Sequence, residues 1–202
     1  MTKVVWGAKA ASVIALAFAA ASCGTLTRQG TSSSYLVITS LQGSPGLTNK
    51  FGNVLQSDVL NVDPQTRQQS IAPDMGQVTL ALALKDPGSS NNPNTPTPNN
   101  YVTVTQYHVE YVRSDGRNVQ GVDVPYAFDG AVTATVQNTA SVGFTLVRIQ
   151  AKQEAPLQAL AGGGSSIAIS TIARVTFYGH DQTGREVSVT GNIEVDFADW
   201  AG

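Results

Sequence analysis

The chain has 202 residues, with 12 basic and 14 acidic side chains and a formal charge of −2 at neutral pH. Charged residues make up 13% of it, about half the usual share for soluble domains, and no basic patch suited to nucleic acid is present. Because the chain has one cysteine, an internal disulfide is excluded, and stability must come from sheet pairing and apolar burial.

Residues 1–22 have the layout of an export signal. Lys3 and Lys9 are their only charges, and an apolar, alanine-rich run follows. The run is shorter than the about 20 residues of a membrane-spanning helix. A basic region before a short apolar one is typical of a signal peptide, so we expect a signal helix that is removed. Without the two lysines, 10 basic residues remain against 14 acidic ones.

The apolar run ends in Ala20-Ala21-Ser22-Cys23, small residues directly before the only cysteine. This pattern resembles the lipobox of bacterial lipoproteins, with Ala20 where that family usually has leucine. The resemblance implies cleavage between Ser22 and Cys23 and a fatty-acid anchor of the palmitate type on Cys23. It also implies a place in the cell envelope, and Gly24, where aspartate would retain the protein at the inner membrane, favours the outer membrane. The alternative is an ordinary signal peptide cut after Ala21.

Two later segments lack apolar periodicity. Residues 23–34 are small and polar, which predicts a flexible tether between the anchor and a domain over 35–202. The length after the signal suits one domain. Residues 86–100 hold no apolar side chain except proline and no aromatic anchor, so we expect a mobile loop there.

The first half of the domain predicts a series of strands. Candidates are 35–41, a short apolar stretch within 51–62, 78–84 and 101–113. In the last of these the apolar positions change parity, which predicts a bulge near Gln106. Asp115-Gly116 then predicts a tight hairpin turn.

The second half predicts further strands and the clearest pattern in the chain. Strands are expected at 132–136 and 144–151, followed by a short helical turn within 154–160. Apolar residues then alternate with polar ones over 167–178 and again over 187–197, and a glycine-containing turn separates the two runs. This pattern predicts a long hairpin that is buried on one face.

With about seven to nine strands and almost no helix, the chain predicts an all-β fold. A second sheet is the usual cover for a half-buried sheet, so we expect a single antiparallel β-sandwich. It is similar in architecture to immunoglobulin-like and fibronectin-like domains, without their Cys-Trp-Cys core.

No catalytic constellation is present in the sequence. The two histidines, His108 and His180, fit a sheet surface and a solvated turn, and no nucleophile, phosphate or dinucleotide motif occurs. We therefore expect no enzyme activity, cofactor, metal or small-molecule substrate. Calcium at the turns 114–116 and 180–181 is the weaker alternative to solvated turns. A two-carboxylate site would have to be drawn from Asp123, Asp129, Asp181, Asp196 and Asp199.

Two aromatic residues are candidates for stacking on a ligand. Tyr178 is on the polar parity of its strand, and Trp200 lies near the C-terminus beside Asp199. Sugar-binding sandwiches stack ligand rings on exposed aromatics. The competing interpretation is that Trp200 closes one end of the sandwich and that Tyr178 packs on its neighbours.

Three functions are consistent with these patterns. The leading hypothesis is a non-enzymatic envelope lipoprotein whose domain is structural or binds other envelope proteins. The second is a carbohydrate-binding module using Tyr178 or Trp200, and the third is a two-carboxylate hydrolase.

Overall fold

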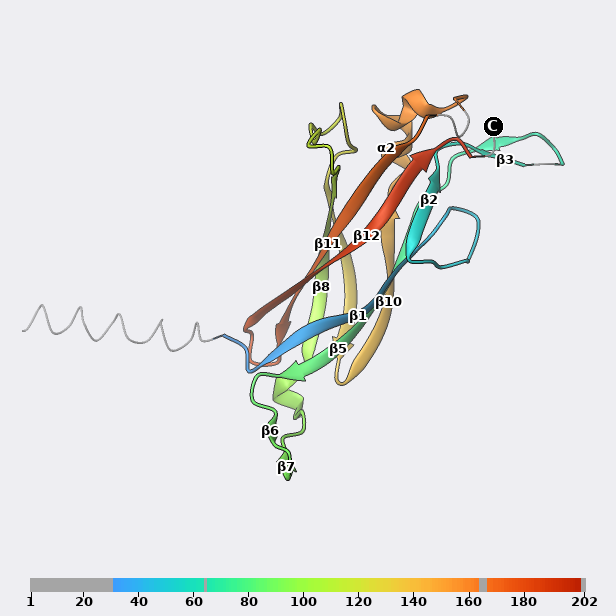
Figure 1. Ribbon diagram of the computed structural model, residues 1–202. Coiled ribbons are helices and arrows are strands. Elements are labelled where there is room, and N and C mark those ends of the chain that lie inside the picture. Colours follow the sequence, from blue (N-terminus) through green and yellow to red (C-terminus); the bar gives the residue numbers. More distant parts are fainter. Residues whose placement is uncertain (1–30, 64, 164–166, 201–202) are drawn as a thin grey trace, which may run out of the picture. The chain divides into compact units, whose positions relative to one another are not determined.

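The computed structural model describes residues 31–63, 65–163 and 167–200 (Figure 1). The predicted leader, Ser22 and Cys23 lie outside the described residues. Residues Ser33–Gly202 form one compact unit. Its elements are β1 (Ser34–Ser44), β2 (Val54–Asp58), β3 (Asn61–Val62), β4 (Gln69–Ser70), β5 (Asp74–Leu84), β6 (Gly88–Ser89), β7 (Asn92–Pro93), η1 (Pro98–Asn100), β8 (Val102–Val112), β9 (Phe128–Val136), β10 (Thr139–Val147), α2 (Ile149–Gln153), η2 (Leu157–Leu160), β11 (Ile169–Asp181) and β12 (Glu186–Ala198).

Two sheets face each other across one hydrophobic core. Sheet 1 has the strand order β1-β5-β10 and sheet 2 the order β2-β12-β11-β8-β9. Inward side chains of both sheets, including Leu80 of β5 and Val175 of β11, belong to one buried cluster. Pairing within both sheets is antiparallel except between β2 and β12, which are parallel. The predicted all-β sandwich is confirmed.

The order of the long strands follows the immunoglobulin-like scheme. Strands β1, β5 and β10 correspond to the A-B-E sheet, and β8, β11 and β12 to the C-F-G sheet. Strand β9 extends the second sheet beyond β8, as the C′ strand does in variable-type domains. The structure thus has the β-sandwich architecture that the sequence predicted.

The β11–β12 hairpin arises from the two alternating runs. Val175 and Phe177 are fully buried, whereas Arg174 directly before them and Tyr178 directly after them are exposed. The connecting turn is held by the Asp181 carboxylate, which accepts hydrogen bonds from the backbone N–H groups of Thr183 (2.8 Å) and Arg185 (3.0 Å). The predicted hairpin is confirmed, with polar side chains on its outer face.

The bulge predicted near Gln106 is present in β8. The register of β8 shifts between Val104 and Gln106 relative to β9, and at the same place relative to β11. Val104 and Tyr107 are both buried on either side of the shift, while Thr105 and Gln106 are both exposed. The bulge thus returns the apolar residues to the core and places two adjacent polar side chains on the outer face.

Aromatic side chains fill the centre of the core. The ring centroids of Tyr107 and Phe144 lie 5.2 Å apart, and those of Phe144 and Phe177 lie 5.3 Å apart, both pairs edge to face. The Tyr111 hydroxyl donates a 2.6 Å hydrogen bond to the carbonyl oxygen of Leu146 in the opposite sheet. These contacts join β8 and β11 to β10 without a disulfide.

Three segments differ from the sequence predictions. The strand expected over 144–151 ends at Val147, and α2 follows, because Ala151 and Leu157 turn inward and close one end of the core. The Asp115-Gly116 turn does not close a tight hairpin, since residues 113–127 intervene before β9. The segment 86–100 contains the short β6–β7 pair and the η1 turn, which the sequence did not predict, and its mobility stays a prediction.

Candidate functional site

A surface groove lies on the outer face of sheet 2, near the turn of the β11–β12 hairpin. Its volume is about 720 Å³, and we call it the Tyr178 groove. Strands β8, β11 and β12 and the hairpin turn supply its lining. The lining residues are Thr105, Gln106, Tyr178, Gly179, His180, Gly184, Glu186, Val187 and Ser188.

The register of the sheet brings the polar lining residues beside the tyrosine. Tyr178 is paired with Gln106 of β8 on one side and with Ser188 of β12 on the other. The three residues form a row across the sheet, roughly 10 Å long at normal strand spacing. Tyr178 is 43% exposed, so part of its ring is free to contact a ligand. The prediction that Tyr178 points away from the core is confirmed.

The bulge of β8 shapes the floor of the groove. At Gly179 a Cβ atom would meet the backbone carbonyl oxygen of Thr103, so glycine permits the close approach of β11 to β8. Bulges commonly re-aim side chains next to functional sites. Here the bulge turns Thr105 and Gln106 toward the Tyr178 groove.

The groove offers mainly uncharged hydrogen-bonding groups. Thr105, Gln106 and Ser188 each carry a side chain that donates and accepts hydrogen bonds. Glu186 is the single acidic lining residue, and the lining contains no lysine or arginine. His180 lies on the same outer face, and its Nδ1 is 3.3 Å from the carbonyl oxygen of Asp181.

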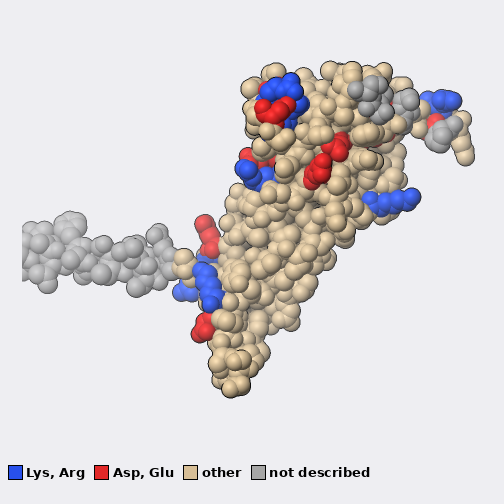
Figure 2. All heavy atoms as spheres, in the orientation of Figure 1, with Lys and Arg blue, Asp and Glu red and all other residues tan. Residues whose placement is uncertain are grey.

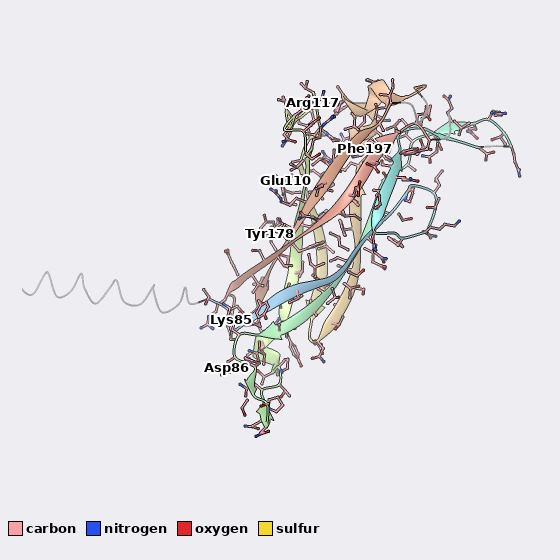
Figure 3. All side chains as sticks on the ribbon, viewed as in Figure 1. Lys85, Asp86, Glu110, Arg117, Tyr178 and Phe197 are labelled. Carbon is pink, nitrogen blue, oxygen red and sulfur yellow. The ribbon has the colours of Figure 1, made fainter. Side chains whose placement is uncertain are left out.

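Beyond the groove, the outer face of sheet 2 continues with paired polar side chains. Arg174 Nη1 lies 2.6 Å from Glu110 Oε1, and His108 Nδ1 lies 2.7 Å from Asp129 Oδ1. Figure 3 shows Glu110 and Tyr178 along the same side of the sheet, whereas Phe197 lies in the core. This face is therefore hydrated and charged, as is typical of the solvent side of an antiparallel sheet.

Trp200, the other predicted stacking residue, is not part of this groove. Its side chain is 38% exposed, and its backbone N–H donates a 3.2 Å hydrogen bond to Asp58 Oδ1. Ser188 is beside Tyr178 in the register, and β12 then runs on to Ala198. At the rise of a β-strand, these ten residues separate the two aromatics by roughly 30 Å. The structure does not bring Tyr178 and Trp200 together.

Four of the five aspartates considered for a two-carboxylate site, all except Asp196, have local roles. Asp123 accepts a hydrogen bond from the N–H of Val119, and Asp129 contacts His108. Asp181 holds the hairpin turn, and Asp199 accepts a 2.6 Å hydrogen bond from the N–H of Gly162. None of these aspartates lines the Tyr178 groove.

In the first of the two turns considered for calcium binding, 114–116, the Asp115 carboxylate is paired with two arginines. Asp115 Oδ2 lies 2.7 Å from Arg113 Nη2 and 2.8 Å from Arg117 Nη2. These two guanidinium groups hold the pKa of the Asp115 carboxyl well below its ordinary value. Over residues 31–63, 65–163 and 167–200, no three or more His, Cys, Asp or Glu side chains gather in a way that fits a metal ion.

The structure contains a buried ion pair that the sequence did not predict. Lys152 of α2 and Asp74 of β5 have fully buried side chains, and Lys152 Nζ lies 2.8 Å from Asp74 Oδ1. Lys152 also donates to the carbonyl oxygen of Asp58 (2.8 Å), and Ser57 Oγ donates to Asp74 Oδ2 (2.6 Å). The N–H of Gly46 completes the set with a 2.7 Å bond to Asp74 Oδ1.

The buried pair is suited to a structural role. Burial raises the pKa of Asp74, although Lys152, Ser57 and the Gly46 N–H act against that rise. No substrate reaches these groups, because the side chains of Lys152 and Asp74 are shielded from solvent. Their hydrogen bonds join α2, β2 and β5 at one end of the sandwich.

The outer face of sheet 1 differs from that of sheet 2 because it lacks charge. Strands β1, β5 and β10 contain one charged residue, Asp74, and it is buried. We call the outer face of these strands the uncharged face. In Figure 2 the charged side chains nearest to β1 and β5 lie at the end of β5, where Figure 3 labels Lys85 and Asp86 directly after the strand. Its exposed and half-exposed residues include Tyr35, Val37, Met75, Thr79, Ala81 and Ser141.

The described part of the chain contains no helix with the length and apolar character needed to cross a bilayer. Comparisons of the chain with protein-family models, with curated proteins and with solved structures found no match.

Proposed function

We propose that this protein is an exported, lipid-anchored lipoprotein of the cell envelope whose sandwich is a non-enzymatic module that binds another envelope protein. The anchor is proposed from the signal-like residues 1–22 and from Cys23. The outer membrane is the favoured location. The observation that carries the binding function is the uncharged face.

A sheet face in contact with water normally alternates apolar residues inside with polar and charged residues outside. Sheet 2 follows this rule, with Glu110, Arg174 and Asp129 on its outer face. Sheet 1 places Thr79 and Ala81 on its central strand β5, Ser141 on β10, and Tyr35 and Val37 on β1. Depletion of charge combined with exposed aromatic and aliphatic side chains is typical of the centre of a protein interface.

The edges of sheet 1 support the same proposal. Strands β1 and β10 are its two edges, and neither contains a charged residue. Soluble proteins commonly protect edge strands with lysine and other charges, which discourage contact with a second sheet. A protein partner that covers the face and its edges explains why this protection is missing.

Site-specific photo-cross-linking in intact cells tests the proposed contact. A photoreactive amino acid replaces Val37 on the uncharged face, and Ile172 on the outer face of β11 is the matched control. The two side chains have similar exposure, 40% and 45%. We expect the Val37 position to form one discrete heavier adduct that the Ile172 position does not form. Failure to form an adduct at Val37, or equal adducts at both positions, contradicts the proposal.

The anchor has a separate test. Mass spectrometry of the mature N-terminus is expected to find a peptide that begins at an acylated Cys23. Replacement of Cys23 by alanine is expected to release the protein from membranes. A mature chain that begins at an unmodified Ser22 contradicts acylation and leaves the interface proposal standing.

A further inference from the structure

We propose that the Tyr178 groove binds a neutral oligosaccharide, with the tyrosine ring as its stacking platform. The groove lies on sheet 2, whereas the proposed protein contact lies on sheet 1. The two proposals therefore use different residues, and each can fail without the other.

The position of Tyr178 suits stacking. Its neighbours in the sheet register are Gln106 and Ser188, and Gly179 follows it in the chain. None of these neighbours has a bulky apolar side chain that could cover the tyrosine ring. An aromatic face of this kind stacks on the apolar C–H face of a pyranose ring, which combines apolar area with a fixed orientation.

The polar lining matches a ligand that is rich in hydroxyl groups. A sugar hydroxyl both donates and accepts hydrogen bonds, and so do the hydroxyls of Thr105 and Ser188 and the amide of Gln106. The row Gln106-Tyr178-Ser188 is roughly 10 Å long, which accommodates more than one sugar ring. The groove lies open on a sheet surface, so an internal stretch of a glycan chain fits it.

The charges in the groove lining favour neutral glycans over acidic ones. Phosphate, sulfate and carboxylate groups are usually bound by arginine or lysine, and the lining contains neither. Glu186 would repel such groups. The geometry therefore favours neutral sugars. A cationic amine held by Tyr178 and Glu186 is the competing ligand class, and the experiment distinguishes it.

Isothermal titration calorimetry of the full chain in mild detergent tests the inference. The probes are cellohexaose, maltohexaose and N-acetylated chitohexaose. We expect at least one of them to bind, and Tyr178→Ala to weaken that binding by about tenfold or more. Tyr178→Trp is expected to retain binding, whereas Gln106→Ala and Ser188→Ala are expected to weaken it. The far-ultraviolet circular dichroism of each variant verifies folding.

Trp200→Ala is the matched control, because Trp200 is an aromatic of similar exposure, 38% against 43%, outside the groove. We expect this variant to bind as the wild type does. Absence of binding to all three probes overturns the inference, and so does an equal loss in Trp200→Ala and Tyr178→Ala. Binding of spermidine that depends on Glu186, without saccharide binding, also overturns it and assigns the groove to cations.

Discussion

Lys152 of α2 and Asp74 of β5 form an ion pair from which solvent is excluded at both side chains. Removal of one partner leaves the other charge buried and uncompensated, which is costly in proteins. We expect Lys152→Met to lower the free energy of unfolding by about 3–5 kcal/mol, measured by urea denaturation. Lys50→Met is the control, because Lys50 is exposed. A loss in Lys152→Met no larger than that in the control contradicts a stabilising role for the pair.

The raised pKa of Asp74 has a consequence for the pH dependence of stability. Because burial raises the pKa, the folded protein binds this proton more tightly than the unfolded chain does. The favourable contribution is complete below the ordinary carboxyl value of 3.8 and is lost as the pH rises through the raised pKa. Lys152, Ser57 and the backbone N–H of Gly46 contact this carboxyl and favour its charged form.

Asp74→Asn, which removes the ionisable group, provides the comparison. We expect the difference in unfolding free energy between wild type and this variant to shift in favour of the wild type as the pH falls from neutrality toward the ordinary carboxyl pKa. Urea denaturation across that range measures the difference. A difference that stays constant, or that shifts in the opposite direction, contradicts the assigned pKa change.

The alternation of apolar and polar residues along the chain predicted the long C-terminal hairpin and the bulge in β8. The alternating runs around Phe177 and Val195 gave β11 and β12, and the parity change at Gln106 gave the bulge. The outward direction of Tyr178 followed from the same alternation. The boundary at Val147 was missed because the apolar residues that follow it, such as Ala151, continue a strand-like sequence while facing the end of the core.

Features that depend on long-range register left no local signal. Asp74 and Lys152 are 78 residues apart, and neither has an unusual sequence neighbourhood. The sequence also does not show that Gln106 and Ser188 flank Tyr178, because the three residues belong to three different strands. The uncharged face is likewise assembled from β1, β5 and β10, and only their pairing order shows that they share a surface.

Gly76 marks a point where the core has no room for a methyl group. A Cβ atom at this position would overlap the ring of Phe144, so we expect Gly76→Ala to lower stability by about 1–3 kcal/mol. Gly143→Ala is the matched control, because its Cβ would meet only the carbonyl oxygen of Gly76, at 3.8 Å. Thermal unfolding followed by circular dichroism compares the two variants. Equal melting temperatures would refute the close packing of Phe144 on Gly76.

Asp115 is expected to titrate far into the acid range. Its guanidinium partners Arg113 and Arg117 lower its pKa, so its contribution to stability is present above the ordinary value of 3.8 and is lost as the pH falls through the lowered pKa. The ¹³C chemical shift of the carboxyl group, followed by NMR, reports this titration. We expect Arg113→Gln to move the pKa back toward the ordinary value. If Asp115 in the wild-type protein titrates with a midpoint at the ordinary carboxyl value, its pairing with Arg113 and Arg117 is contradicted.

Gly179 tests whether the bulge and the Tyr178 groove depend on the close approach of two backbones. In Gly179→Ala the new Cβ atom would meet the carbonyl oxygen of Thr103 and the Cα atom of Val104. Backbone atoms cannot rotate away as a side chain can, so β8 must separate from β11 locally. We expect faster amide hydrogen exchange over 102–106, together with weaker binding at the groove.

The control for this variant is Ser188→Ala, which alters the same groove without adding a backbone contact. It is expected to leave the exchange of β8 unchanged. Hydrogen exchange measured by mass spectrometry resolves the peptide concerned. If Gly179→Ala retains wild-type protection over 102–106, the glycine is not required for the bulge, and the groove owes its shape to other residues.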